Sequence, residues 1–270
     1  MAGRHAPGAG SGTEIDAPGD AAADIHTHTL RSDGVLEPPE LLRQAYAVGI
    51  RLFAIADHDN LAAYRELTAP GADPLPEGLD LVPAVEINAV TRDLDLGLPE
   101  GELHVLGIGV DPSDDAFEAA IAAQRGARRQ RFTATVVRLR EIGVPVDAHL
   151  PEGVMESDDA LGRPTLARAL VAAGHAESVE DAFRRILGHG LPGYVSRTGM
   201  GPVEAIRAIR AAGGLASIAH FGEAPQRVPL LRELIAEGLD GLETHHRTFG
   251  PETRAAMSAT CSAYTRASSP

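Results

Sequence analysis

The 270 residues include 38 acidic and 24 basic side chains, which gives a formal net charge of −14 at pH 7. A chain this acidic excludes a broad surface for long duplex nucleic acid, because phosphate contacts require clustered Lys and Arg. The one cysteine, Cys261, can form no internal disulfide, and no stretch has the apolar length of a membrane span or signal peptide, so we expect a cytoplasmic protein without a membrane partner.

The first 23 residues are rich in Ala, Gly and Pro and show no apolar periodicity. We therefore expect residues 1–23 to form a disordered leader, to which His5 belongs. The remainder alternates strand-like with helix-like segments, and a chain of this length is compatible with a single α/β barrel.

A histidine pair and an acidic turn open the structured part of the chain. Asp24-Ile25-His26-Thr27-His28 reads as a strand end, and Ser32-Asp33-Gly34 follows as a turn. Strand side chains repeat with period two, so His26 and His28 project from the same face, and the turn can fold Asp33 back toward them.

A second motif closes the next strand. A helix is expected from Glu37 to a stop at Gly49, and the apolar run at residues 52–56 reads as a buried strand followed by Asp57-His58-Asp59. This strand, helix, strand order favours a parallel sheet or barrel, in which His26, His28 and His58 fall at the C-terminal strand ends. Imidazole and carboxylate groups gathered there suit zinc, manganese or iron.

Two further strands each carry one candidate ligand. After a predicted helix at residues 61–67, the segment 79–87 reads as a strand with Glu86 near its end, and the segment 103–108 as a strand with His104 at its start. Taken alone, Glu86 is more often a surface acid than a metal ligand, so these two residues are candidates only in combination with the motifs before them.

These motifs together resemble the PHP family, named for polymerase and histidinol phosphatase. Its opening signature is a histidine pair, a Ser-Asp-Gly turn and a strand ending in Asp-His-Asp, and the segments around Glu86 and His104 resemble its third and fourth motifs. The resemblance covers roughly Asp24 to Phe249 and is closer to stand-alone members that act on nucleoside phosphates and short RNA. It implies a PHP-type distorted (β/α) barrel of the α/β class.

The chain changes character after Ser113, where strand-like runs become few. We expect a helical insertion at residues 113–193 between a first barrel part at 24–112 and a second at 194–270. Its helical stretches carry several arginines, which either pair with nearby acids on a solvated face or form a local patch that steers substrate. They are Arg125, Arg128, Arg129, Arg131, Arg138 and Arg140.

Within the insertion, Gly162-Arg163-Pro164 resembles the family's Gly-Arg-Pro-His segment, with Thr165 in place of the histidine. The resemblance implies that Arg163 faces the substrate phosphate, a role that suits the two-pronged grip of a guanidinium. Arg197 is a candidate for a second phosphate contact.

The barrel pattern resumes with a helix at residues 202–212 and a strand at 215–220 that ends in His220, a predicted metal ligand. A helix at 228–237 leads to a strand from Leu239, whose end offers His246 as a phosphate-facing candidate, whereas His245 is expected to pack. A last helix begins near Pro251. The family's next strand, ending in Gly-Ser-Asp-x-His, has no counterpart here, so we expect a barrel that is truncated at its C-terminus.

The resemblance implies a metal-dependent phosphoesterase that acts on a nucleoside 3',5'-bisphosphate or on the 5' end of a short RNA, that is, a small phosphorylated substrate or short oligonucleotide. Hydroxide on a metal bridge, rather than a side chain, would attack phosphorus. A complete member holds up to three divalent ions, here Mn, Zn or Fe. By this analogy the ligands are His26, His28 and Glu86 for one ion, Glu86, His104 and His220 for a second, and Asp33 with His58 for a third.

Three alternatives stay open at this point. Hydrolysis of histidinol phosphate is the same chemistry on another substrate, and a metal-dependent amidohydrolase is another reaction on a similar barrel. The third alternative is an inactive remnant with a binding role, and the absent last motif is its main support.

Overall fold

The computed structural model describes residues 22–91, 101–154 and 162–267, without the side chains of residues 265–267. Most of the predicted leader lies outside these ranges, and Ala22 and Ala23 already belong to the first strand. The strands are β1 (Ala22–Thr27), β2 (Ile50–Ile55), β3 (Asp80–Thr91), β4 (Gly101–Ile108), β5 (Leu215–Ile218) and β6 (Gly241–Leu242). The helices are α1 (Pro38–Ala47), α2 (Ala62–Thr68), α3 (Asp115–Glu141), α4 (Arg163–Ala172), α5 (Val179–Ala182), α6 (Pro202–Ala211), α7 (Val228–Ala236) and α8 (Pro251–Ala267), with the short helical turns η1 (Asp147–His149), η2 (Phe183–Leu187) and η3 (Ala224–Gln226).

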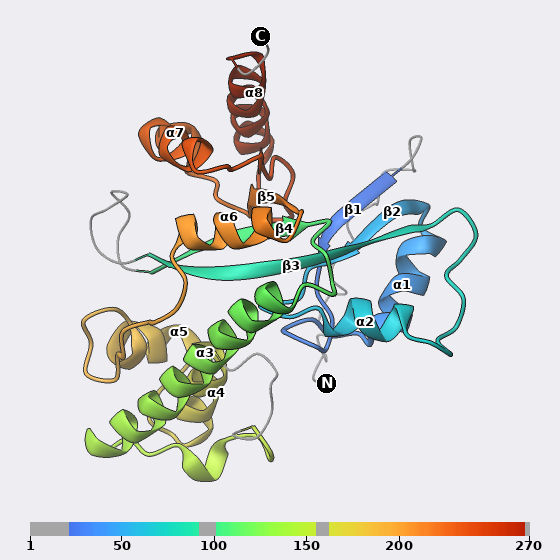
Figure 1. Cartoon of the computed structure of the whole chain (residues 1–270). Coiled ribbons are helices and arrows are strands. Elements are labelled where there is room, and N and C mark those ends of the chain that lie inside the picture. The colour runs from blue at the N-terminus through green and yellow to red at the C-terminus, as the bar shows by residue number, and fades with distance from the viewer. Residues whose placement is uncertain (1–21, 92–100, 155–161, 268–270) are drawn as a thin grey trace, which may run out of the picture.

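The six strands form one sheet in which spatial order follows chain order, from β1 at one edge to β6 at the other (Figure 1). The sheet curls into an open half-barrel, because the ends of its two edge strands approach each other: His26 Nδ1 on β1 lies 3.1 Å from Glu243 Oε1, one residue beyond β6. The expected distorted (β/α) barrel of the α/β class with a helical segment is therefore confirmed, in the form of a mixed sheet that curls into a half-barrel.

The sheet is mixed, so the expectation of purely parallel strands is wrong for one strand. β1, β2 and β3 are parallel, but β4 runs antiparallel to both β3 and β5. The chain has too few residues between Thr91 and Gly101 for a parallel crossover, which takes a dozen or more. Because β4 is reversed, its start lies at the edge where the parallel strands end, and His104 pairs in register with Asn88 near the end of β3.

Helices pack on the sheet through one apolar face each. α1 begins at Pro38, whose ring fixes the first helical φ, and it buries Leu42 and Ala45 against β2. It ends as expected near Gly49, which has a φ of 93° and leads directly into β2. On β4 and β5, α6 buries Ile206 and Ile209 completely, and each such side chain stabilises the fold by about 1.5–3 kcal/mol.

The described residues between Ser113 and Gly193 form only helices and turns, which Figure 1 shows as a body beside the sheet. The long helix α3 belongs to two hydrophobic cores. Its first half contributes Phe117 and Ile121 to the core over the sheet, and its second half contributes Phe132 and Leu139 to a core shared with α4 and the turn η2. None of the helices in the described ranges is long and apolar enough to span a membrane.

Candidate metal centre

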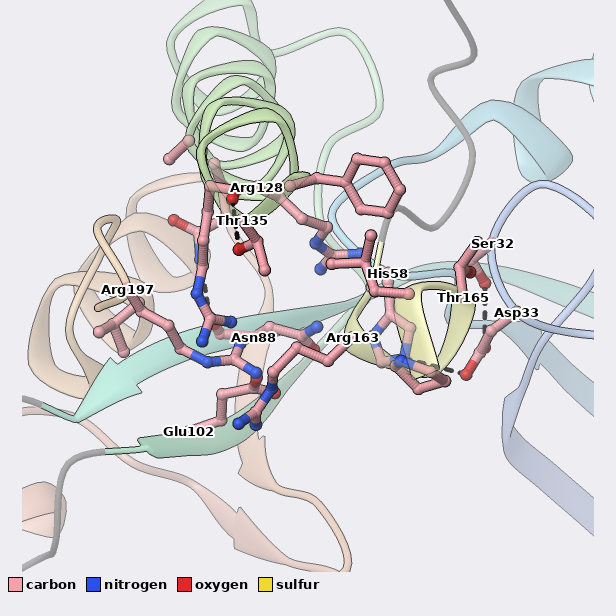
Figure 2. Close-up of a pocket in the computed structure, with 18 of the residues that line it drawn as sticks. Ser32, Asp33, His58, Asn88, Glu102, Arg128, Thr135, Arg163, Thr165 and Arg197 are labelled. Atoms are coloured by element: carbon pink, nitrogen blue, oxygen red, sulfur yellow. Dashed lines mark hydrogen bonds and ion pairs between the residues drawn. The ribbon is translucent and has the colours of Figure 1, made fainter. Parts of the chain in front are cut away.

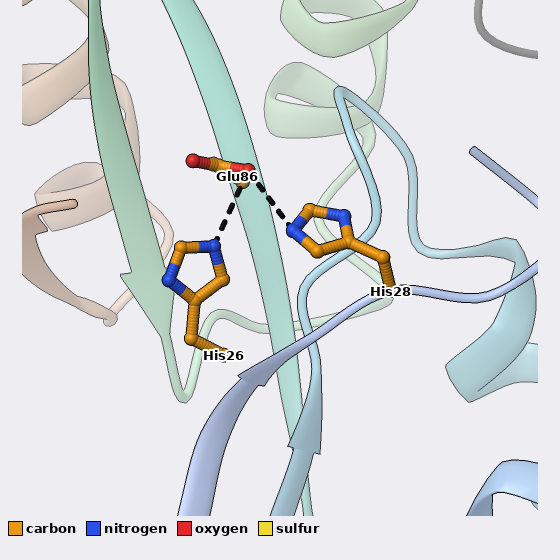
Figure 3. A group of neighbouring side chains, drawn as sticks. All are labelled: His26, His28 and Glu86. Carbon is orange, nitrogen blue, oxygen red and sulfur yellow. Dashed lines mark ion pairs between the residues drawn. The ribbon is translucent and has the colours of Figure 1, made fainter. Parts of the chain in front are cut away.

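The buried carboxylate of Glu86 lies at the centre of the site. Its side chain is only 1% exposed, and it lies on the inward face of β3. Figure 3 shows His26 and His28 directed at it from the end of β1 and the residues that follow. The period-two projection expected for these two histidines is confirmed, because the Nε2 atoms of His26 and His28 lie 3.3 Å and 3.2 Å from the same oxygen, Oε2.

Three more imidazoles complete the surroundings of Glu86. His58 follows β2, and its Nδ1 lies 3.2 Å from Glu86 Oε2. The other carboxylate oxygen, Oε1, lies 2.8 Å from His104 Nδ1 and 3.0 Å from His220 Nε2. The two last nitrogens are 3.1 Å apart, so Glu86, His104 and His220 converge on one point as the ligand pattern predicts.

Asp33 meets His28 and His58 on the solvent side of Glu86. Its oxygens lie 3.3 Å from His28 Nδ1 and 3.5 Å from His58 Nε2. The turn that carries it needs glycine at position 34, because a Cβ there would lie 2.3 Å from the carbonyl oxygen of His28. The close approach of Gly34 to the backbone at His28 is thus what folds Asp33 back over the histidines.

The loops that bear His28 and His58 are held together by Asp57. This carboxylate is 1% exposed and accepts hydrogen bonds from the backbone N–H of Thr29 at 2.7 Å, the Thr29 hydroxyl at 2.6 Å and the Ser32 hydroxyl at 2.6 Å. A carboxylate that accepts several hydrogen bonds is held in a fixed orientation. The first acid of Asp57-His58-Asp59 therefore supports the centre from behind instead of lining it.

Sequence reasoning missed two carboxylates that orient the candidate ligands. Glu102 Oε2 lies 2.9 Å from His104 Nε2 and so holds the ring with its Nδ1 atom toward Glu86. Glu243 contacts His26 Nδ1 through Oε1 and accepts the backbone N–H of His220 at 2.6 Å through Oε2. Such carboxylate partners fix the ring of a metal-binding histidine and raise its basicity.

The ionisation of Glu86 and of His26 is governed by burial and by their hydrogen bonds with neighbouring groups. Burial opposes the ionisation of Glu86, but hydrogen bonds with His104, His220, His26 and His28 lower the pKa of its carboxyl well below the usual range. Burial also disfavours the charged form of His26, yet its hydrogen bonds with Glu243 and Glu86 raise its pKa to about 10. A cation that binds through the His26 ring must therefore displace a proton from it.

The donor set fits divalent metal ions. The Nδ1 atom of His58 is buried and, although it lies 3.2 Å from Glu86 Oε2, it makes no hydrogen bond with any described residue, which suits an atom that has a metal as its partner. Three groups of nitrogen and oxygen donors each lie within 4.8 Å of one another, a spacing that one ion can bridge. They are His26, His28 and Glu86; His28, Asp33 and His58; and His58, Glu86 and His104.

A pocket of about 810 Å³ opens beside the centre, between the strand ends and helices α3 and α4 (Figure 2). Asp33, His58 and His104 form its metal-side wall. Several cationic side chains line the rest, including both arginines predicted to contact phosphate. They are Arg128, Arg131, Arg163, Arg168 and Arg197.

The two predicted arginines differ in their partners. Arg163 is the first residue of α4, its guanidinium lies 5.6 Å from the centre of the Phe183 ring, and it forms no ion pair with any residue in the described ranges. Arg197 instead contacts the carboxylate of Glu102, which places it one side chain from His104. Arg163 is thus the guanidinium better placed to meet an incoming anion.

The candidates after β6 lie on the opposite side of the centre. The ring of His246 is 5.3 Å from that of His220 and 6.1 Å from that of His26, which places it beside the predicted ligands. His245 is exposed, so the expectation that it packs is wrong. β6 ends at Leu242, so both histidines lie in the loop that follows the strand.

No family model matches the chain, but individual proteins do. It is 31% identical to a 5'-3' exoribonuclease of Haemophilus influenzae over 82% of this chain and 77% of that protein. It is 30% identical to a 3',5'-nucleoside bisphosphate phosphatase of Chromobacterium violaceum over 83% of this chain and 76% of that protein.

Two solved structures share the fold. A protein of Bifidobacterium adolescentis described as a metal-dependent phosphoesterase has a TM-score of 0.71 and 34% identity over 92% of this chain and 85% of its own. An amidohydrolase from Chromobacterium violaceum, solved with bound sulfate and no metal, has a TM-score of 0.73 and 26% identity over 91% of this chain and 84% of its own.

Proposed function

This chain belongs to a PHP-like family of metal-dependent phosphoesterases, and we propose that it removes phosphate from a nucleotide. The substrates we favour are a nucleoside 3',5'-bisphosphate and the 5' end of a short RNA, because the relatives named above act on such molecules. The proposal places this chain with the stand-alone members of the family.

One observation carries the proposal: a buried carboxylate is ringed by five imidazoles, and two of these, His58 and His104, line a pocket whose other walls bear arginines. Histidine and carboxylate donors hold divalent cations, and arginines bind phosphate oxygens. A phosphate ester is the substrate that uses both. An amide substrate would not require Arg163, which has no ion-pair partner among the described residues.

The residues would divide the work in the following way. His26, His28 and Glu86 would hold one metal ion, Glu86, His104 and His220 a second, and Asp33 with His58 and His28 a third. Bound Mn, Zn or Fe ions would lower the pKa of water and neutralise charge on the phosphoryl oxygens. Glu102 and Glu243 hold the rings of His104 and His26 in place.

The substrate itself would be oriented by the pocket. Arg163 would grip a phosphate group from the α4 side, with Arg197 next to it and His246 on the far side of the centre. A fixed guanidinium positions the phosphoryl group for attack and stabilises its negative charge.

The test is phosphate release by purified protein reconstituted with Mn²⁺, Zn²⁺ or Fe²⁺. We expect turnover of adenosine 3',5'-bisphosphate or a 5'-phosphorylated dinucleotide in preference to histidinol phosphate. His26→Ala should lower kcat roughly a hundred- to a thousandfold, because a group that stabilises the transition state is lost. His149→Ala, at an exposed position in η1, is the matched control.

Two results would contradict the proposal. Faster turnover of histidinol phosphate than of either nucleotide would assign a different substrate class. Full activity in the His26→Ala protein would remove the predicted cluster from the reaction.

A further inference from the structure

Asp59, the residue after His58, is a buried charge that the proposed reaction does not use. It is 0% exposed, and its φ of 54° is in the left-handed region, which a non-glycine residue adopts only where the surroundings hold it. Its carboxylate contacts helix α3 through Arg128. A buried charge in a strained conformation next to a candidate ligand calls for a specific partner.

That partner is Arg128. Its guanidinium forms an ion pair with Asp59 Oδ2, and the backbone N–H of Asn88 donates to Oδ1 at 3.2 Å. Arg125, about one turn earlier on α3, donates to the Asp59 carbonyl oxygen at 2.7 Å. The carboxylate and the carbonyl of one loop residue are thus both bound by arginines of the same helix.

The backbone of Asp59 also reaches the central carboxylate strand. Its N–H donates to the carbonyl oxygen of Glu86 at 3.0 Å, and His58 and Glu86 form an isolated parallel bridge. Gln124, on the same part of α3, donates to the carbonyl oxygen of Asn88 at 2.7 Å. The middle of α3 is therefore joined to both loop and strand at the point where they present His58 and Glu86.

We propose that the Asp59–Arg128 ion pair is a positioning device. It fixes His58 relative to Glu86 for metal binding, and it aligns His58 with the pocket that the arginines line. The proposal rests on the metal centre of the proposed function. Loss of the arginine leaves a buried carboxylate without its countercharge, and a loop that turns Asp59 toward water to relieve this moves His58 with it. Arg128 thus acts through His58 and not on the substrate.

The test is calorimetric titration of the metal-free protein with Mn²⁺, which needs no substrate. Arg128→Ala should weaken Mn²⁺ binding about ten- to a hundredfold, as loss of a group behind a ligand usually does. Arg128→Lys should recover part of the affinity, because an ammonium still neutralises the buried carboxylate. Arg140→Ala, on the same helix at an exposed ion pair with Asp147, should bind Mn²⁺ as the unaltered protein does.

A double-mutant cycle tests whether Asp59 and Arg128 act as one pair or as two independent residues. If the pair acts as one unit, Asp59→Asn combined with Arg128→Ala should bind Mn²⁺ no more weakly than Arg128→Ala alone. Additive losses would overturn the proposal. If Arg128→Ala fails to fold by circular dichroism, the Arg128→Lys and Asp59→Asn proteins and their double variant provide the same cycle.

A kinetic measurement tests the alternative role. Unchanged Mn²⁺ affinity in Arg128→Ala together with a raised KM would make Arg128 a substrate contact and overturn the positioning role. The metal titration does not depend on the proposed function, because it measures Mn²⁺ binding at His58 even if no nucleotide is a substrate.

Discussion

Arg163 shows how one side chain is prepared for an anion. It lies at the first turn of α4, where the backbone N–H groups already favour negative charge, and its guanidinium lies over the ring of Phe183. The aromatic face restricts the guanidinium without neutralising it. Most other described arginines in the helical segment 113–193 have acidic or carbonyl partners, such as Arg185 with Asp181 and Arg138 with the Pro192 carbonyl oxygen.

We predict that Arg163→Ala raises KM for a nucleotide substrate about ten- to a hundredfold. The loss corresponds to one charge-assisted hydrogen bond, roughly 1.5–3 kcal/mol. Arg163→Lys should also be impaired, because an ammonium cannot form the two-pronged contact. Steady-state kinetics give the measurement, and Arg184→Ala, whose side chain is 72% exposed, is the control. Unaltered kinetics in Arg163→Ala would remove the residue from the substrate site.

At the residue scale, the sequence indicated several of the predicted ligands because they lie at or just after a strand end. His26 and His220 could be placed from an apolar run that stops near the residue, whereas Glu86 lies inside β3, which continues beyond the predicted end at residue 87 to Thr91. Glu102 and Glu243 were missed because a lone acid near a strand end is common. The available signal was spacing: Glu102 is two residues before His104, and period two puts both on one face.

The turn between β1 and α1 depends on the close approach of Gly34 to the backbone at His28. Gly34 lies so close to His28 that a Cβ would meet its carbonyl oxygen at 2.3 Å and the backbone nitrogen of Thr29 at 2.6 Å. No side-chain movement can relieve contacts with backbone atoms. Any larger residue must open the turn that places Asp33 over the histidines.

We therefore predict that Gly34→Ala destabilises the protein by about 1–3 kcal/mol and weakens metal binding at Asp33. Urea unfolding and metal titration measure the two effects. Gly126→Ala is the matched control, since Gly126 lies inside α3 with nothing within 4 Å of the added Cβ. That change should stabilise the protein by about 0.5–1 kcal/mol, because alanine favours the helix. Equal effects at the two glycines would show that the turn is not constrained as described.

At the element scale, helix positions could be predicted well and strand direction could not. Predicted helix 202–212 corresponds to α6 and predicted helix 228–237 to α7, each within one residue at either end, because apolar spacing, Pro and Gly mark helix ends directly. The direction of β4 follows from the short connection that precedes it. An apolar run in the sequence has the same pattern whether the strand is parallel or antiparallel to its neighbour. Even so, His104 was correctly placed beside Glu86, because a reversed strand begins where its parallel neighbours end.

For the whole molecule, the candidate centre joins every strand of the sheet. β1 brings His26, β3 brings Glu86 and β4 brings His104. His58 follows β2, and the pair His220 and Glu243 follow β5 and β6. A metal ion at this position would tie together segments from both edges of an open half-barrel.

We predict that metal removal lowers Tm by roughly 5–10 °C. A ligand at about 100 times its Kd stabilises the folded state by about 2.7 kcal/mol, and about 1 kcal/mol shifts Tm by roughly 2–4 °C in a protein near this size. Scanning calorimetry with and without a chelator gives the measurement. The His26→Ala protein should show a smaller shift. If chelation leaves Tm unchanged, no metal is bound in the folded protein under those conditions.

The spatial order of the strands also has a consequence for chain entropy. In four of the five pairs of neighbouring strands, the connection between the two strands is much shorter than the one between β4 and β5, which runs from Ile108 to Leu215. The entropic cost of closing a flexible loop grows with its length, by about 0.6 kcal/mol for each doubling. This long excursion has a hydrophobic core of its own, built around Leu139, Leu166 and Leu187. Because a folded body replaces a flexible loop, the ends of the excursion are held near each other, and β5 can join β4 at a much smaller entropic cost.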